Sequence, residues 1–370
     1  ERRGPVFVRR SLPVILPRST FLLCSRLRGG LKKSGSMSCG YNCRMIIAIP
    51  DDYHGVVSKL DCLKKLSGHD VRIFRDVAPA PAALAANLRE AEIVVPVRER
   101  TRYTRELIGQ LPKLKLFSQT GRSTRHIDVA ACTERGIVVA AGTHASPYTV
   151  AEHTWGLILS ALRRIPEDAA RMKRGELRQG FSGSLHGRTL GIFGLGKIGK
   201  PVAATGASFG MRVLAWGQEG TRSAAKAAGY DVAAGKEELF ERSDVLCLLV
   251  RLDKSTRGIV TADDLGRMKP SALLVNTARA ELVAPGALAE ALKKGRPGLA
   301  AVDVYENEPV VRGDHPLLQL DNALCTPHTA WLEPETYELY FGEAFENIVS
   351  FLAGRPTNII NPEVLAANKA

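Results

Sequence analysis

The sequence lacks any long hydrophobic segment. None of its apolar runs reaches the roughly eighteen residues that a helix needs to span a bilayer, so we expect no membrane partner. Aromatic residues are also scarce, at 6%, yet hydrophobic residues of all kinds occupy 45% of the 370 positions. That share is ordinary for a globular protein and is enough for two domains with filled cores.

Cysteine is too scattered to form a disulfide framework. The seven cysteines show no paired spacing, and Cys39 and Cys43 have no second pair of ligands with which to hold a metal ion. Cys247 and Cys325 lie within apolar runs and are expected to be buried thiols. These features fit a reducing compartment, the cytoplasm, and we expect no metal site.

Acidic residues are almost missing from residues 1–44, which contain ten Lys and Arg but one Glu. This segment therefore carries +9 of the net charge of +13, and the rest of the chain carries +4. A nucleic-acid-binding protein would spread its positive charge over the folded part, so we expect no nucleic-acid partner. We expect residues 1–44 to form a disordered tail. It is either an overlong reading frame, which we favour because Met37 and Met45 are the first methionines, or a transit peptide for organellar import.

The clearest motif is a glycine-rich stretch. The apolar run Leu190–Phe193 leads into Gly194-x-Gly196-x-x-Gly199, and an amphipathic segment and a second apolar run follow. Strand, glycine turn, helix and strand within about thirty residues are typical of a dinucleotide-binding site. Gly194 permits the tight turn, Gly196 the approach of the pyrophosphate, and Gly199 close packing of the helix. The N-terminus of that helix attracts phosphate.

Elsewhere the chain alternates between apolar runs and helix-like stretches, which is typical of parallel sheets covered by helices. The stretches 56–66 and 127–133 are predicted to be helical. Ser146 is a suitable N-cap and Pro147 a suitable first residue for a long helix over 148–162. The strands expected before this helix cover residues 45–49, 71–74, 93–97, 114–118 and 137–140.

A second group of strands begins at Thr189, around the glycine turn. A helix over 335–352 follows these strands, and because no strand comes after it we expect it to return to the first domain. The chain would then cross between the domains near Ser146 and near His328, a hinge that permits closure around a substrate. The six strands expected in this group cover residues 190–193, 213–216, 245–250, 273–276, 299–304 and 323–325.

Three ionisable residues follow strands of the second group. Arg279 comes after 273–276, and Glu308 and His328 come after the last two strands. Ligands of open α/β sheets bind outside the carboxyl ends of the strands. An Arg, a Glu and a His at three such ends, next to a dinucleotide site, therefore predict an active site.

The chain from Met45 to Pro362 resembles the D-isomer-specific 2-hydroxyacid dehydrogenases. The resemblance implies an α/β fold with two doubly wound parallel-sheet domains, in which a Rossmann NAD(P)-binding domain (147–328) is inserted into a flavodoxin-like substrate-binding domain (45–146 and 329–370). It also implies a homodimer. The motifs that carry it are Gly194-Leu-Gly-Lys-Ile-Gly199, Asn276-Thr-Ala-Arg279, Val302-Asp-Val-Tyr-Glu-Asn-Glu-Pro309 and Thr326-Pro-His328.

The activity implied by the resemblance is NAD(P)-dependent hydride transfer between nicotinamide and a D-2-hydroxy or 2-oxo acid, such as phosphoglycerate, glyoxylate or hydroxypyruvate. His328 would be the general acid and base, because histidine exchanges protons near neutral pH. Glu308 would stabilise its imidazolium form. Arg279 would offer a planar fork to the substrate carboxylate or carbonyl.

The resemblance assigns further contacts. Arg98 could join the substrate site or could be an ordinary solvated surface residue. The other expected substrate contacts are the backbone N–H groups of Arg122, Ser123 and Thr124. The expected cofactor contacts are Gly194, Gly196, Lys197, Ile198, Gly199, Gly217, Val250, Thr277, Ala278 and Asp303, of which Asp303 would meet the nicotinamide amide.

The sequence departs from the family pattern at the end of the second strand of the glycine motif. Gly217 stands where an acidic residue usually binds the ribose hydroxyls, so a 2′-phosphate would not be repelled. Arg222 could attract that phosphate, or Glu219 could take over the ribose. We expect NAD, with NADP as the alternative. The loop at Arg251 and the substrate loop at Ser123 also differ, which leaves the substrate open.

Two other functions share this fold. A dinucleotide-sensing corepressor would bind the cofactor and a peptide partner with little turnover, and the Arg279, Glu308 and His328 set does not exclude it. A formate dehydrogenase would resemble the same family, but that branch carries Gln in place of the acidic partner, so Glu308 argues against it.

Overall fold

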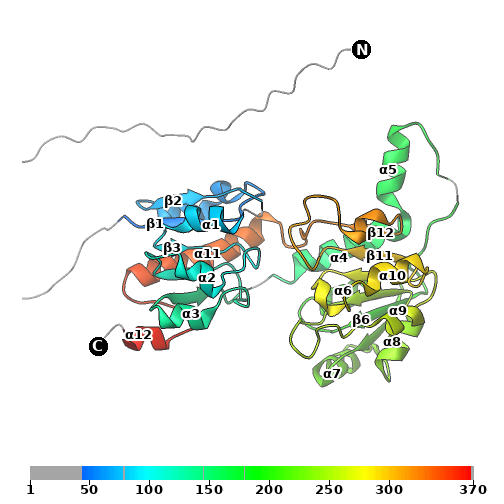
Figure 1. The fold of residues 1–370 in the computed structure, drawn as a ribbon. Coiled ribbons are helices and arrows are strands. Elements are labelled where there is room, and N and C mark those ends of the chain that lie inside the picture. The colour runs from blue at the N-terminus through cyan, green and yellow to red at the C-terminus, as the bar shows by residue number, and fades with distance from the viewer. Residues whose placement is uncertain (1–43, 78–79, 145, 179, 368–370) are drawn as a thin grey trace, which may run out of the picture. The chain divides into compact units, whose positions relative to one another are not determined.

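The computed structural model describes residues 44–77, 80–144, 146–178 and 180–367. The expected tail over residues 1–44 lies, except for Arg44, outside the described residues. The described chain contains two sheets, and every strand pair in them is parallel (Figure 1). Among the described residues, every helix is too short or too polar to cross a bilayer.

The first sheet has five strands in the order β2-β1-β3-β4-β5. This is the flavodoxin-like order, in which the chain starts near the middle and winds outward in both directions. The strands fall within or next to the predicted apolar runs because both faces of a parallel sheet are buried. They are β1 (Ile46–Ile49), β2 (Asp70–Ile73), β3 (Ile93–Val94), β4 (Leu116–Gln119) and β5 (Val138–Ala141).

Helices from two distant parts of the chain cover the first sheet. On one face lie α1 (Pro81–Leu88), α2 (Arg105–Gly109) and α3 (Val129–Glu134). The other face packs against α11 (Pro334–Leu352), the helix expected to return here. The short α12 (Glu363–Ala367) follows it.

The stretch predicted to be helical over 56–66 is helical, but it does not form one continuous helix. Two 3-10 helices, η1 (Val57–Lys59) and η2 (Asp61–Leu66), occupy this stretch instead. They are separated at Leu60, whose φ of −74° and ψ of 134° are extended. The apolar residues of this stretch still pack against α11, so the sequence pattern indicated the burial correctly but not the helix type.

The second sheet has seven strands in the order β12-β11-β10-β9-β6-β7-β8, a doubly wound order around the glycine turn. The prediction missed β8, because two residues make no recognisable apolar run. The strands are β6 (Thr189–Phe193), β7 (Arg212–Trp216), β8 (Asp231–Val232), β9 (Val245–Leu248), β10 (Leu273–Asn276), β11 (Leu299–Val302) and β12 (Ala323–Cys325).

Each face of the second sheet has its own apolar core. One contains buried residues of α4 (Tyr148–Arg163) and α6 (Gly199–Ser208), and α7 (Glu219–Ala227) adds Ala225. The opposite core is built with α8 (Lys236–Arg242), α9 (Ala262–Arg267) and α10 (Ala287–Lys293). Short 3-10 turns η3 (Ala280–Leu282) and η4 (Pro316–Gln319) complete the loops.

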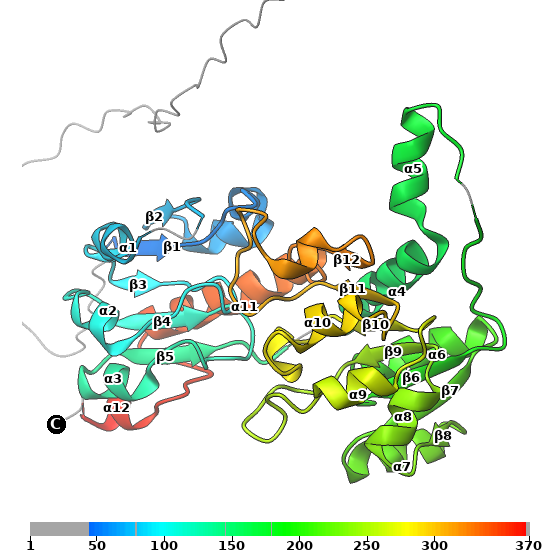
Figure 2. The same ribbon diagram turned by 45° about the vertical axis from the view of Figure 1, so that its right-hand side comes forward.

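The start of α4 differs from the prediction. Pro147, not Ser146, takes the N-cap position, and no side chain caps the helix. After α4 comes α5 (Ile165–Lys173), which has no buried residue and projects away from the second sheet in both ribbon views (Figures 1 and 2). The helix α5 therefore contributes nothing to the core of the chain.

Candidate active site

The glycine turn lies between β6 and α6. Gly194 has a φ of +99°, and a Cβ at this position would lie 2.9 Å from the Val250 backbone. A Cβ on Gly199 would collide with the Gly194 carbonyl oxygen. A Cβ on Gly196, by contrast, would meet nothing within 4 Å, and Ile198 at the N-cap makes no side-chain cap hydrogen bond. The turn thus leaves open space beside a helix N-terminus, which fits a pyrophosphate.

Gly217 directly follows β7, at the position expected to meet the ribose. The Arg222 side chain folds back over it, with Nε donating to the Gly217 carbonyl oxygen at 3.1 Å. Thr221 accepts a hydrogen bond from the Leu195 backbone N–H at 3.3 Å, which ties α7 to the glycine turn. Arg222 therefore stands beside the expected ribose position, and within the described part of the chain its Nε contact is the only hydrogen bond of the guanidinium.

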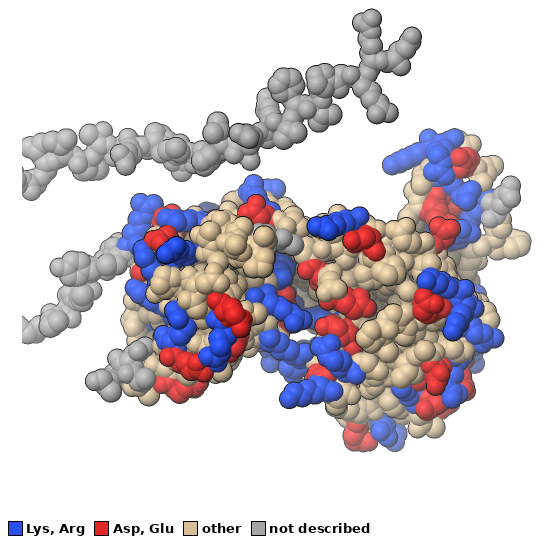
Figure 3. Space-filling view, in the orientation of Figure 1, with Lys and Arg blue, Asp and Glu red and all other residues tan. Residues whose placement is uncertain are grey.

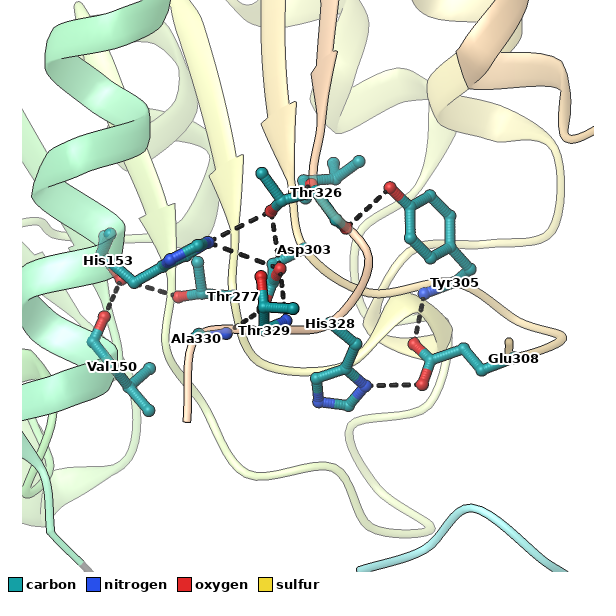
Figure 4. Close-up of polar contacts among 12 residues, drawn as sticks. Val150, His153, Thr277, Asp303, Tyr305, Glu308, Thr326, His328, Thr329 and Ala330 are labelled. Atoms are coloured by element: carbon teal, nitrogen blue, oxygen red, sulfur yellow. Dashed lines mark hydrogen bonds and ion pairs between the residues drawn. The ribbon is translucent and has the colours of Figure 1, made fainter. Parts of the chain in front are cut away.

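His328 lies in the loop after β12 and has a φ of +53°. Its Nδ1 atom is 2.5 Å from Oε2 of Glu308, and Oε1 of Glu308 accepts the Tyr305 backbone N–H at 2.8 Å (Figure 4). The side chains of His328 and Glu308 are 27% and 29% exposed, so both reach the surface of a cavity. Glu308 is thus anchored by its own loop and orients the imidazole through Nδ1.

Asp303 directly follows β11 and is fully buried, with 0% exposure. Its carboxylate accepts the Thr326 hydroxyl at 2.6 Å and the backbone N–H groups of Thr329 and Ala330 at 2.9 Å each (Figure 4). Burial alone would raise the pKa of Asp303, but these hydrogen bonds and one from His153 outweigh it and lower the pKa. The ionised carboxylate therefore holds the backbone that follows His328 and the side chain of Thr326 before it.

Arg279 follows β10, in a loop held by Asn276. The Asn276 side chain donates to the Arg279 carbonyl oxygen at 2.9 Å and accepts the Ala278 N–H at 3.1 Å. The guanidinium of Arg279 donates through Nη2 to Oε2 of Glu99 at 3.1 Å. Burial would raise the pKa of Glu99, but the charge of Arg279, together with smaller contributions that include the charge of Arg98, outweighs burial and lowers the pKa to about 2. Glu99 belongs to the loop after β3, so this ion pair links the loops of the two sheets.

Arg98 is not an ordinary solvated residue. Its guanidinium lies 4.8 Å from the ring centroid of Tyr340 and 5.3 Å from that of Trp331. Its backbone N–H donates to Thr120 Oγ1 at 2.8 Å, and burial lowers the pKa of its side chain. Among the described residues it forms no ion pair within 4.0 Å, so an anion in the cavity could take its charge.

A cavity of about 1130 Å³ brings four expected residues together: Arg98, Arg279, Glu308 and His328. Loops of both sheets line it, and Figure 3 shows basic side chains grouped near the middle of the face in view. Arg122, Ser123 and Thr124 are not among the lining residues, and Arg122 is exposed. The expected catalytic residues are thus assembled, whereas the three expected backbone donors lie outside this lining.

The other expected cofactor residues surround the glycine turn and the end of β10. Thr277 is buried, and its hydroxyl lies 2.8 Å from that of Thr154 in α4. Lys197 is exposed beside Gly196, and Ala278 is half-buried. These positions leave the glycine turn and the end of β10 on the same edge of the second sheet, where a dinucleotide would bind.

Comparison with known proteins agrees with this geometry. Residues 155–330 match the family model described as "D-isomer specific 2-hydroxyacid dehydrogenase, NAD binding domain". A glyoxylate reductase from Aeropyrum pernix is 35% identical over 308 residues, which cover 80% of this chain and 91% of that protein. The chain belongs to the D-isomer-specific 2-hydroxyacid dehydrogenase family. Its two-sheet fold is also that of the family.

Two more members of this family show how far the likeness extends. A phosphoglycerate oxidoreductase from Vibrio cholerae has a solved structure that superposes with a TM-score of 0.81 at 47% identity, covering 84% of this chain and 99% of that one. A D-3-phosphoglycerate dehydrogenase from Methanocaldococcus jannaschii is 38% identical over 75% of this chain. The chain spans about half, 53%, of the length of that relative.

Sequence reasoning about this family member missed three residues of the site. His153 lies in α4, and its Nε2 lies 3.1 Å from Thr326 Oγ1 and 3.4 Å from Asp303 Oδ1. No local pattern marked it, because the polar residues Glu152 and Thr154 flank it in the same helix. No sequence pattern marked Glu99 or His126, because each lies in a polar loop. Only the tertiary structure brings the two residues to the cavity.

Proposed function

We propose that this protein is an NAD-dependent oxidoreductase that transfers a hydride between nicotinamide and a D-2-hydroxy or 2-oxo acid. The observation that supports it best is the contact of 2.5 Å between His328 and Glu308 in the same cavity as Arg279. The relatives described above are named as dehydrogenases or reductases of such acids. Nothing in these comparisons supports the corepressor function.

His328 is the general acid in the direction of reduction. Glu308 accepts from Nδ1, so Nε2 is the ring atom left to donate a proton to the oxygen that develops negative charge. When bound, the nicotinamide supplies or accepts the hydride. In the opposite direction, the neutral imidazole takes the proton back.

Arg279 and Arg98 hold the substrate carboxylate. Arg279 presents a planar fork that can bind a carboxylate with two hydrogen bonds. Arg98 adds a positive charge that no carboxylate of the described residues neutralises within 4.0 Å. Their loops follow strands of different sheets, so substrate binding and hinge closure would be coupled.

The cofactor is held by the glycine turn, with NAD as the main cofactor and NADP as the alternative. Gly194, Gly196 and Gly199 leave room for the pyrophosphate, and the matched family model is that of an NAD-binding domain. Gly217 brings no carboxylate to the ribose, and Arg222 lies beside it. These two residues decide between the cofactors.

The protein is also proposed to be a homodimer. In and after α5, four large apolar side chains stand in solvent: Ile165, Met172, Leu177 and Phe181, which are 52%, 73%, 84% and 99% exposed. Apolar side chains gathered on a projecting segment are typical of an interface between chains. A second copy of the chain would cover them.

The proposed function is tested by following the oxidation of NADH and of NADPH with glyoxylate, hydroxypyruvate, pyruvate and 3-phosphohydroxypyruvate. Turnover of at least one acid is expected, faster with NADH. Binding of both nucleotides, detected by fluorescence, without reduction of any 2-oxo acid would contradict the proposal and would favour the binding-protein alternative.

A further inference from the structure

The cavity that contains the expected catalytic residues also contains an acidic residue with no role in the proposed chemistry. Glu99 lies 3.1 Å from the guanidinium of Arg279, and its side chain is 30% exposed. Its charge is retained at neutral pH, because the charges of Arg279 and its other neighbours together outweigh burial and lower its pKa to about 2. A permanent negative charge beside the expected carboxylate site would weaken the binding of anions, so it requires an explanation.

A second residue in the same wall of the cavity is His126. Its side chain is buried, with 9% exposure, and neither ring nitrogen has a hydrogen-bond partner among the described residues. Burial lowers the pKa of His126 to about 4, so the ring is neutral and has one donor and one acceptor. An unpartnered buried imidazole loses free energy unless a ligand or water completes its hydrogen bonds.

Glu99 and His126 both line the cavity, although the two ring nitrogens of His126 are covered from solvent. The two side chains are close enough for the charge of each to shift the pKa of the other. An ionised carboxylate beside a neutral imidazole accepts hydrogen bonds from a ligand and repels a phosphate. Arg279 and Arg98 can still neutralise one substrate carboxylate next to this pair.

We propose that Glu99 and His126 form a subsite for a hydrogen-bond donor, a hydroxyl or an ammonium or guanidinium group, on the side chain of the 2-oxo acid. This subsite rests on the proposed oxidoreductase function and specifies its substrate class. A substrate with a second anionic group near C3 is disfavoured, because that group would lie beside Glu99.

The test compares substrates that differ by one group. Hydroxypyruvate and pyruvate differ by a single hydroxyl, 3-phosphohydroxypyruvate adds a phosphate, and 2-oxo-5-guanidinopentanoate carries a cation. Glyoxylate has no side chain and reports on the carboxylate site alone. The kcat and KM of each are measured with the wild-type protein and with Glu99→Gln and His126→Phe. Glu237→Gln, at the exposed first turn of α8 and outside the lining of the cavity, is the matched control for loss of one carboxylate.

The wild-type protein should prefer hydroxypyruvate or the guanidino acid over pyruvate by about tenfold or more in kcat/KM, because a site that hydrogen-bonds a substrate group rejects the analogue that lacks it. The preferred acid of these two shows whether the subsite binds a hydroxyl or a cationic group. Glu99→Gln should reduce that preference by about tenfold and improve the relative use of 3-phosphohydroxypyruvate. His126→Phe should reduce the preference as well, whereas Glu237→Gln should leave it unchanged.

Three results would overturn the subsite while leaving the oxidoreductase intact. The first is a wild-type preference for 3-phosphohydroxypyruvate over hydroxypyruvate. The second is an unchanged substrate ratio in Glu99→Gln. The third is a loss of kcat/KM in Glu99→Gln that is as large with glyoxylate as with the preferred acid, which would show that Glu99 only holds Arg279 in place. Failure of the wild-type protein to reduce any acid would instead overturn the proposed function.

Discussion

Asp303 lies inside the turn that carries His328. Its two carboxylate oxygens accept the backbone N–H groups of Thr329 and Ala330, the two residues that follow that histidine, at 2.9 Å each. His328 itself has a φ of +53°, which few residues other than glycine adopt without support. The buried carboxylate stabilises this backbone conformation and so sets the position of the imidazole.

Asp303→Asn tests this relationship. Thr329 and Ala330 donate to different oxygens of Asp303, and in the amide one of these two atoms becomes a donating NH₂ group, so one of the two hydrogen bonds is lost and the turn should loosen. We expect kcat to fall by about tenfold or more, whereas the Kd of NADH, measured by fluorescence, should change by less than about threefold. A large loss of NADH affinity with unchanged kcat would show that Asp303 is a cofactor contact, as the family resemblance implies.

His328→Ala removes the proposed proton donor. The kcat should fall by about 10²- to 10⁴-fold, which is the contribution that general acid–base catalysis typically makes. Binding of NADH should stay nearly intact because the glycine turn is untouched. Steady-state kinetics and fluorescence titration measure the two quantities, and unchanged turnover would remove His328 from the mechanism.

Arg222→Gln tests the choice of nucleotide. Arg222 is the basic side chain beside Gly217, and its removal should lower kcat/KM for NADPH by about tenfold relative to NADH. Lys226→Gln, which removes an exposed charge one turn further along α7, is the control. Gly217→Asp is a less direct variant because its Cβ would lie 3.0 Å from Thr221 Oγ1. An NADPH to NADH ratio that Arg222→Gln leaves unchanged would contradict this role.

His126 makes the stability of the protein depend on pH. Burial lowers its folded-state pKa from 6.5 to about 4, against the opposing charge of Glu99, so the unfolded chain takes up the proton first as the pH falls. The free energy of unfolding is therefore highest above pH 6.5 and decreases between about pH 6.5 and 4. The low pKa of Glu99, about 2, affects stability only below its ordinary value of 4.5.

Urea unfolding at about pH 7 and pH 5 measures this effect. Between these two pH values, the free energy of unfolding of the wild-type protein should fall by about 2 kcal/mol more than that of His126→Gln. This figure follows from about 1.4 kcal/mol per pH unit for the uptake of one proton. His186→Gln, which changes an exposed histidine, should behave like the wild type. An equal pH dependence in the wild type and His126→Gln would show that His126 is not buried as described.

Leu177 and Phe181 test the proposed dimer. Substitution of both by Ser removes the two most exposed large apolar side chains of the projecting segment, at 84% and 99% exposure. Because neither belongs to a core cluster, folding should be unaffected and the mass in solution should halve. Light scattering after gel filtration measures that mass. A dimer that survives the double substitution would place the interface elsewhere.

Much of the fold could be predicted from the apolar runs. In parallel sheets both faces are buried, so a strand is recognisable as a short continuous hydrophobic segment, and eleven of the twelve strands lay at predicted positions. The twelfth, β8, is two residues long and carries no such signal. The 3-10 turns at 57–66 and the uncapped start of α4 differ from the prediction because packing against neighbouring elements overrides weak local preferences.

Some residues of the candidate site could likewise be predicted from the sequence, and others could not. Residues that follow apolar strands, such as Arg279, Glu308 and His328, could be proposed from chain order alone, because parallel strands end at one edge of a sheet. The contacts of Glu99 with Arg279 and of His153 with Asp303 join residues that are 180 and 150 positions apart. No local pattern encodes such distances. Only the packing of loops and helices around the two sheets decided which charges meet, and therefore which anions and donors the cavity can accept.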